Sequence, residues 1–265
     1  MAFWRACYEN SSPACQLFAN SLLYATMRKR RKKESFLKRL LRRLGLLLLL
    51  LVLLSCLPVL LLRWFAPPVT AFMLQKDHSG SRNAPYHYHW MDWRELGSKA
   101  PLAVMAAEDQ KFPDHWGFDV ESIHKAVMQR RNNKFLRGAS TITQQVAKNL
   151  FLWPGRSFIR KAIEAYYAMV IELSWPKQRI LEVYLNIAEF GPGIYGVPAA
   201  SRLYFKKTPR QLSEADAALL AAVLPNPKQF QVDNPTAYVL KRQRWIMQHA
   251  ARLRQYGWLA RVAEN

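Results

Sequence analysis

Cysteine is scarce in this chain of 265 residues, and the few that occur lie near its start. Cys7 and Cys15 precede a long apolar run and Cys56 lies inside it, so residues 57–265 contain none. A disulfide framework and a thiolate metal site are therefore excluded from this larger part. His87 and His89 form a pair, but no acidic or thiolate cluster stands at ligand spacing, and we predict no metal ligands.

Acidic residues are also few, with 18 Asp and Glu against 39 Lys and Arg, which gives a formal net charge of +21. Residues 1–63 hold 12 of these basic and 2 of these acidic residues, so the remainder carries 27 minus 16, or +11. A basic domain suits anionic lipid and pyrophosphate. Nucleic acid would suit it equally, but the membrane segment described next argues against that partner.

Residues 44–62 are almost unbroken apolar sequence, which is long enough to form a transmembrane helix. Basic residues crowd its N-terminal flank from Arg28 onward, whereas only Arg63 follows closely. Because positive residues stay inside, we predict a cytoplasmic segment at 1–43 and a single span of the inner (cytoplasmic) membrane. The rest of the chain is then periplasmic. The alternative, a cleaved signal peptide, is disfavoured because the run is too long and no A-x-A site follows.

The first 26 residues have neither the charge of a targeting segment nor a clear periodicity, whereas Met27 opens directly onto the basic flank. We therefore expect translation to begin at Met27. Mass spectrometry that finds an intact Met1 terminus in cells would contradict this expectation.

After the span we expect a linker and membrane-proximal region at 63–100, followed by the main domain at 101–265. The aromatic run 86–93 is either an interfacial belt or a packed strand or turn at the domain edge, and we favour the second. Strand signals are otherwise sparse. Apolar residues recur at three- and four-residue spacing, which predicts helices at 102–108, 120–131, 141–150, 160–174, 178–188, 196–204, 213–224 and 237–255.

Two blocks within this helical region are unusually particular. Residues 108–117 read E-D-x-x-F-x-x-H-x-G, and residues 138–145 read G-A-S-T-I-T-Q-Q. Three further segments follow in order, at 160–164, 177–186 and 217–225. Together they resemble the peptidoglycan glycosyltransferases, glycosyltransferase family 51. The resemblance covers roughly 101–230 and implies a mainly α, lysozyme-like glycosyltransferase domain, here with one N-terminal transmembrane helix.

The layout most resembles the monofunctional members of that family. Relatives often carry a transpeptidase domain downstream, for which this length leaves no room. Ser35 and Lys38 fit the S-x-x-K pattern of transpeptidases, but they lie in the basic flank and no K-T-G follows. We interpret that match as coincidence and expect no transpeptidase activity.

The resemblance implies polymerisation of lipid II into β-1,4-linked glycan strands, by an inverting transfer that releases undecaprenyl diphosphate. Glu108 matches the catalytic base and Glu164 the second catalytic carboxylate. Glu108 ends an apolar helix and opens onto a turn, so its carboxylate leaves a buried stem, an environment that raises a carboxyl pKa. Asp109 and His115 are expected to shape the cleft.

Several other positions match residues that hold the substrate in the family. Lys125 stands where many relatives have Arg, which would keep the charge but lose bidentate phosphate binding. The full expected substrate-binding set is Ser140, Gln144, Gln145, Lys148, Arg156, Arg160, Lys161 and Lys125. Two structural alternatives stand beside it: Thr141 and Gln144 fit a helix capping box, and Arg160, Lys161 and Glu164 fit a surface ion-pair cluster.

Several cations beside one good base favour synthesis of glycan over its cleavage. A glycosidase needs a carboxylic acid to protonate a poor sugar leaving group, whereas a lipid pyrophosphate leaves readily once its charge is compensated. A lytic enzyme and a non-catalytic membrane scaffold are the alternatives. The expected partners are lipid II, the nascent glycan strand, the membrane and other cell-wall synthesis or division proteins, and no nucleic acid. No cofactor is required, although a divalent cation at the pyrophosphate stays open.

Overall fold

The computed structural model describes residues 13–75, 86–121, 124, 128, 140–155 and 157–264. Two of the expected substrate-binding residues, Lys125 and Arg156, lie outside them, as does the start of the second motif at 138–139. The chain forms two compact units, Met1–Leu57 and Pro58–Asn265, which are described separately.

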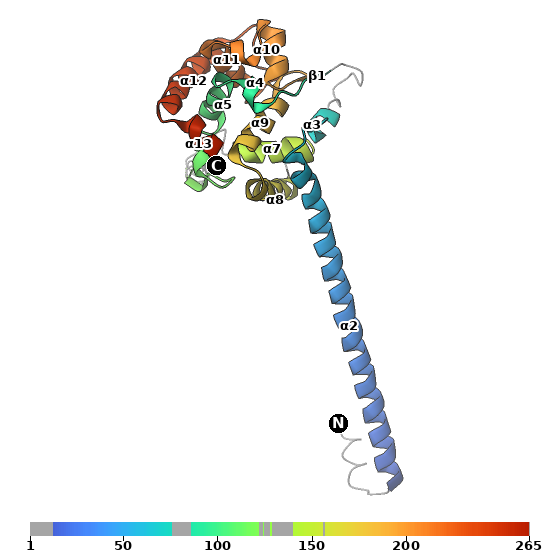
Figure 1. Cartoon of the computed structure of the whole chain (residues 1–265). Coiled ribbons are helices and arrows are strands. Elements are labelled where there is room, and N and C mark those ends of the chain that lie inside the picture. The colour runs from blue at the N-terminus through green and yellow to red at the C-terminus, as the bar shows by residue number, and fades with distance from the viewer. Residues whose placement is uncertain are drawn as a thin grey trace. The chain divides into compact units, whose positions relative to one another are not determined.

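The described part of the first unit belongs to helix α2 (Pro13–Leu62), whose last residues belong to the second unit (Figure 1). Its segment Lys38–Leu62 is long and apolar enough to cross a membrane, and an 18-residue window within it has a mean hydropathy of 3.0. The leucines at 44, 46–51, 53 and 54 all expose their side chains. An exposed apolar helix of this length is compatible with membrane anchoring.

The second unit is mainly helical, as predicted (Figure 1). Each predicted helix is present with its ends within a turn of the expected ones, except 120–131, most of which lies outside the described residues. The helices are α3 (Ala71–Leu74), α4 (Trp93–Leu96), α5 (Lys99–Glu108), α7 (Ile142–Phe151), α8 (Phe158–Ser174), α9 (Lys177–Ile187), α10 (Val197–Phe205), α11 (Glu214–Val223), α12 (Ala237–Gln255) and α13 (Trp258–Glu264), with 3-10 turns η1 (Phe112–Asp114) and η2 (Pro209–Gln211).

A small sheet lies at one side of the helices, with strand order β1 (His87–Tyr88), β3 (Ile194–Tyr195), β2 (Glu189–Gly191). β1 pairs in parallel with β3, and β2 pairs antiparallel with β3 across an irregularity in the register. Residues 86–100, the end of the expected linker and membrane-proximal region, contain a strand and α4, and the expected domain start at 101 falls inside α5. The packed-strand alternative for 86–93 agrees with this pairing.

The core gathers around α5, α9 and α11. The small residues of α11 are nearly all buried, which lets it pack closely on both α5 and α12. α9 packs against α7 and α5 and buries Ile180, Leu181 and Leu185. This packing holds the C-terminal end of α5 beside both α7 and α12.

Carbonyl groups at and just after the end of α2 accept hydrogen bonds from the side chains of Trp175 and Arg179 within the second unit. A helix end leaves its final carbonyls without intrahelical donors. Here the Arg179 guanidinium donates to Leu62 O at 3.0 and 3.2 Å and to Phe65 O at 2.7 Å. The indole of Trp175, which follows α8, donates to Val59 O at 2.8 Å. The end of the apolar helix is therefore part of the folded unit.

Candidate active site

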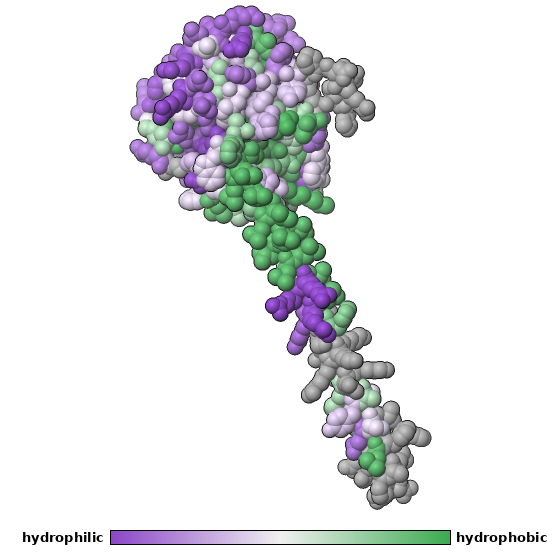
Figure 2. Space-filling view, turned by 45° about the vertical axis from the view of Figure 1, so that its right-hand side comes forward, coloured by the Kyte–Doolittle hydropathy of each residue, from purple (hydrophilic) through white to green (hydrophobic). Residues whose placement is uncertain are grey.

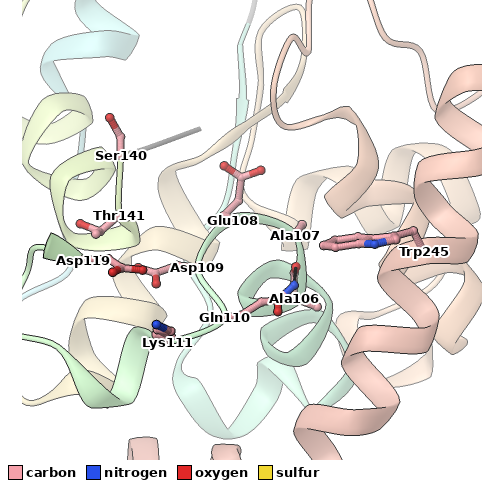
Figure 3. Close-up of a pocket in the computed structure, with 10 residues that line it drawn as sticks. All are labelled: Ala106, Ala107, Glu108, Asp109, Gln110, Lys111, Asp119, Ser140, Thr141 and Trp245. Atoms are coloured by element: carbon pink, nitrogen blue, oxygen red, sulfur yellow. Dashed lines mark hydrogen bonds between the residues drawn. The ribbon is translucent and has the colours of Figure 1, made fainter. Parts of the chain in front are cut away.

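Glu108 is the last residue of α5, where a fully apolar helical stem ends at the wall of a cavity of about 250 Å³. Figure 3 shows its carboxylate with Ser140 and Thr141 to one side and Trp245 to the other. The side chain is only 13% exposed. Ala100 to Ala106, which precede Glu108 in α5, are all buried, and the helix ends at the turn that begins with Asp109.

A short chain of hydrogen bonds fixes one oxygen of Glu108. Gln145 Nε2 donates to Glu108 Oε2 at 2.9 Å, and the Tyr184 hydroxyl donates to Gln145 Oε1 at 3.0 Å. Tyr184 is fully buried, which raises the pKa of its hydroxyl well above the ordinary value and keeps it protonated. Because this hydroxyl donates to Gln145 Oε1, the amide N–H of Gln145 is turned toward the carboxylate of Glu108.

Arg242 of α12 contacts the other oxygen of Glu108. Its Nη2 lies 3.1 Å from Ala107 O and 3.4 Å from Glu108 Oε1. We assigned no function to Arg242 from the sequence, because no motif covers α12. Periodicity identifies this helix but does not say which of its polar groups reach Glu108.

Burial raises the pKa of Glu108 above its ordinary value. The hydrogen bond from Gln145 and the charges of Arg242 and Lys148 oppose this increase, and the neighbouring carboxylate of Asp109 adds to it. A raised pKa makes a carboxylate a better proton acceptor near neutral pH.

A cationic group, here defined as Lys148, Arg160 and Lys161, surrounds the carboxylate of Glu164. Arg160 Nη1 lies 2.9 Å from Glu164 Oε2, and Lys161 pairs with Oε1. Lys161 Nζ also donates to Ser140 Oγ at 3.2 Å. Glu164 is only 2% exposed, so a surface ion-pair cluster does not describe this arrangement.

Lys148 lies between the two carboxylates. Burial lowers the pKa of Lys148, the charges of Glu164 and Glu108 raise it, and those of Arg160 and Lys161 lower it. Its ammonium stands 5.3 Å from the ring centroid of Phe72 on α3. A second cavity, of about 300 Å³, is lined by Lys148, Gln145, Tyr184 and Phe72 among others. Phe72 lies in the segment that sequence analysis expected to be linker.

Gln144 lies elsewhere than its neighbour Gln145. Its Oε1 accepts from Thr141 N at 3.2 Å, while Thr141 Oγ1 accepts from Gln144 N at 3.3 Å, which completes the predicted capping box. Gln144 is buried, whereas the side chain of its neighbour Gln145 reaches Glu108. Binding of the substrate by Gln144 stays a prediction from the sequence.

Asp109 joins the two motifs. Its Oδ2 accepts from Ile142 N at 3.0 Å, at the first turn of α7, and its Oδ1 lies 2.9 Å from His115 Nε2. Thr141 Oγ1 donates to Gly117 O at 2.6 Å. These contacts fix the start of α7 against the first motif, and with it the position of Gln145 beside Glu108.

A buried network lies behind the first motif. Glu172 accepts from Thr143 Oγ1 at 2.5 Å and from Lys177 Nζ at 2.9 Å. Gly117, with φ of +75°, lies against Glu172, and a Cβ there would come 2.8 Å from Glu172 Cγ. Only glycine fits this position without strain.

Comparison with known proteins decides the family. Residues 77–251 match the family described as transglycosylase. The chain belongs to this transglycosylase family. It is therefore an enzyme, a glycosyltransferase, and the scaffold alternative is wrong. No group of three or more His, Cys, Asp or Glu side chains that could hold a metal ion occurs in the described part of the family domain or of α2.

Members of the family from several bacteria are similar over most of their length. A biosynthetic peptidoglycan transglycosylase of Stutzerimonas stutzeri is 50% identical over 215 residues, which cover 80% of this chain and 89% of that protein. Proteins of the same name from Pectobacterium carotovorum and Pasteurella multocida are 49% identical over 212 residues and 52% identical over 192 residues. These matches cover 78% and 71% of this chain, and 86% and 78% of the respective relatives.

Proposed function

We propose that this protein is a peptidoglycan glycosyltransferase that polymerises lipid II into β-1,4-linked glycan strands and releases undecaprenyl diphosphate. The observation that carries the proposal is the pairing of one buried carboxylate, Glu108, with a separate cationic group around the buried Glu164. The first suits removal of a proton and the second suits a diphosphate. The names of the relatives supply the peptidoglycan context.

The reaction is a single displacement at the donor sugar. The 4-hydroxyl of a lipid II GlcNAc attacks C1 of the lipid-linked MurNAc, and its proton passes to Glu108. The bond from C1 to the diphosphate oxygen breaks as the new bond forms, and the electron pair leaves with the diphosphate. Direct attack inverts C1, so an α-linked donor gives a β-1,4 product.

The cationic group stabilises the negative charge that develops on the leaving diphosphate. Arg160 can offer parallel N–H groups to phosphate oxygens, whereas Lys148 and Lys161 act as point charges. Glu164 orients Arg160 and Lys161 and compensates part of their mutual repulsion. Ser140, held by Lys161, contacts the donor where the two parts of the site meet. The roles of Lys125 and Arg156 in substrate binding rest on the sequence.

Exposed apolar side chains give the second unit a surface suited to the outer leaflet of the membrane. Figure 2 shows hydrophobic residues gathered on one side of this unit. Phe158 at the start of α8 is 97% exposed, and Leu173 near its end is also exposed. Ile159, Met169, Trp64, Phe65 and Leu74 also have exposed side chains. Such a patch marks a membrane or partner interface, and a lipid substrate favours the membrane.

We propose a single-pass inner-membrane protein with residues 1–43 in the cytoplasm and the catalytic unit in the periplasm, without transpeptidase activity. The concentration of basic residues before the apolar segment supports this orientation. Other cell-wall synthesis or division proteins are further proposed partners.

Labelled lipid II tests the activity directly. The full chain in detergent should convert it into a glycan polymer that a muramidase digests, and Glu108→Gln should produce none while still binding lipid II. Shortening of a preformed strand would instead support the lytic alternative. A Glu108→Gln variant that polymerises would remove Glu108 from the role of base.

The requirement for a divalent cation is tested in the same assay. Excess chelator, followed by titration of Mg²⁺ or Mn²⁺, should show whether the cationic group alone compensates the diphosphate. We expect substantial activity in chelator, because three cations already surround the proposed diphosphate position. Complete loss that either metal restores would contradict this.

A further inference from the structure

Helix α12 brings an exposed tryptophan to the cavity that holds Glu108. Trp245 lines this cavity and is 41% exposed, while its neighbour Ile246 is fully buried in the core (Figure 3). Burial of an indole is strongly favourable, so a tryptophan that remains open beside a polar cavity is a candidate for ligand contact.

The indole of Trp245 is fixed in place by its own helix. The imidazole of His249, one turn later, stacks on it with ring centroids 3.9 Å apart and an interplanar angle of 27°. His249 Nδ1–H donates to Trp245 O at 2.8 Å, which holds the imidazole in this position. One indole face is thus covered, and the ring is preorganised for a flat partner on the other.

In the part of the chain that the structure describes, the charged residues that line this cavity are mainly acidic, whereas those around Glu164 are basic. They are Glu108, Asp109, Asp119 and Lys111, three carboxylates against one ammonium. The cationic group approaches Glu108 from α7 and α8, whereas Trp245 approaches from α12. A diphosphate is therefore disfavoured in this cavity, and an uncharged ligand with hydroxyl groups is favoured.

We infer that Trp245 is a substrate-binding residue that stacks against the acceptor sugar. The ligand class is a pyranose of the N-acetylhexosamine type, whose C–H-rich face suits the electron-rich face of an indole. Stacking there presents a sugar hydroxyl to the nearby Glu108 carboxylate. The inference rests on the proposed function, because it assigns the acceptor of that reaction to the side of Glu108 opposite the cationic group.

Elongation kinetics with separate donor and acceptor test the assignment. A labelled, preformed lipid-linked glycan oligomer serves as donor, and the concentration of lipid II as acceptor is varied. Trp245→Ala should raise the acceptor KM about tenfold with kcat within about threefold, as expected for a lost stacking contact worth roughly one decade in affinity. Trp245→Phe, which keeps an aromatic face, should recover most of the loss.

Tyr256→Ala is the matched control, because Tyr256 is an exposed aromatic residue that follows α12 and does not line the cavity. It should leave both constants unchanged. An unchanged acceptor KM in Trp245→Ala, or an equal fall of kcat in Trp245→Ala and Trp245→Phe, would overturn the inference. Glu108→Gln, assayed in parallel, separates the two proposals. If Glu108→Gln is inactive while Trp245→Ala is unaffected, only the stacking role is rejected. If Glu108→Gln is active, the proposed base is rejected.

Discussion

Arg242 Nη2 lies 3.4 Å from Glu108 Oε1, while Gln145 Nε2 lies 2.9 Å from Oε2 of the same carboxylate. The two donors come from α12 and α7, on either side of the end of α5. Burial favours the protonated form of Glu108, and these donors favour the ionised form. The pKa of this carboxyl group is therefore set by two opposing influences, each of which can be removed separately.

Replacement of Arg242 should change the pH dependence of the enzyme. In Arg242→Gln the pKa of Glu108 rises further, so the base is protonated over a wider range and the acidic limb of the kcat/KM profile moves to higher pH. We expect roughly tenfold lower kcat/KM near neutral pH, with recovery toward alkaline pH. Arg242→Lys should be milder. Arg244→Gln, an exposed position on the same helix, is the control. A uniform loss at every pH would contradict this explanation.

The buried hydroxyl of Tyr184 should affect stability and activity because it orients the amide of Gln145. Tyr184→Phe removes only the donor to Gln145 Oε1 and leaves the ring in the core. We expect a loss of about 1–2 kcal/mol in the free energy of unfolding, because a buried amide oxygen loses its partner. A fall in kcat of about threefold should accompany it, because the Gln145 amide is free to turn. Thermal unfolding and initial rates in detergent measure both, and an unchanged kcat would show that Tyr184 does not orient Gln145.

Gly117 should tolerate no side chain. Gly117→Ala forces a Cβ against Glu172 in a conformation with positive φ, and we expect it to lower the free energy of unfolding by about 2–4 kcal/mol. Gly257→Ala is a close control: its φ is +65°, but a Cβ there meets nothing within 4 Å. It carries the conformational cost alone, about 1 kcal/mol. Equal unfolding midpoints for the two variants would show that contact with Glu172 contributes nothing.

The charge of Lys148 should determine the alkaline limb of the pH profile of kcat/KM. Its pKa is lowered, so its charge is lost at a lower pH than that of an exposed lysine. Lys148→Ala should raise the KM for the lipid-linked donor about tenfold, since a charge-assisted contact is lost. Lys148→Arg stays charged throughout, so activity that remains should persist to higher pH. Lys241→Ala, exposed on α12, is the control. An identical alkaline limb in the arginine variant would assign that limb to another group.

Local patterns predicted most of the fold and one half of the site. The period of apolar residues identifies α5, α7 and α12 to within a turn, because each buries a continuous face. Glu108, Gln145 and Glu164 could be named because they lie in particular motifs, and Lys148 because it lies one turn after the second motif. The capping box also followed from sequence, since Thr141 and Gln144 interact within one turn.

The contribution of α12 could not be predicted. Arg242 and Trp245 stand more than 130 residues from Glu108 along the chain, and only the packing of α12 on α5 brings them near it. An arginine and a tryptophan on an otherwise polar helix face give no local sign of such a contact. The partners of Asp109 and His115 could not be predicted either. Asp109 contacts Ile142 at the start of α7, and Asp109 and His115 contact each other.

The opposite charges on the two sides of Glu108 have a consequence for inhibitor design. A compound that mimics only a diphosphate meets favourable charge at Lys148, Arg160 and Lys161 but not in the cavity beside Trp245. A compound with an anionic end joined to a neutral or cationic ring would match both sides and span the proposed base. Such a compound would contact side chains from three helices, α7, α8 and α12.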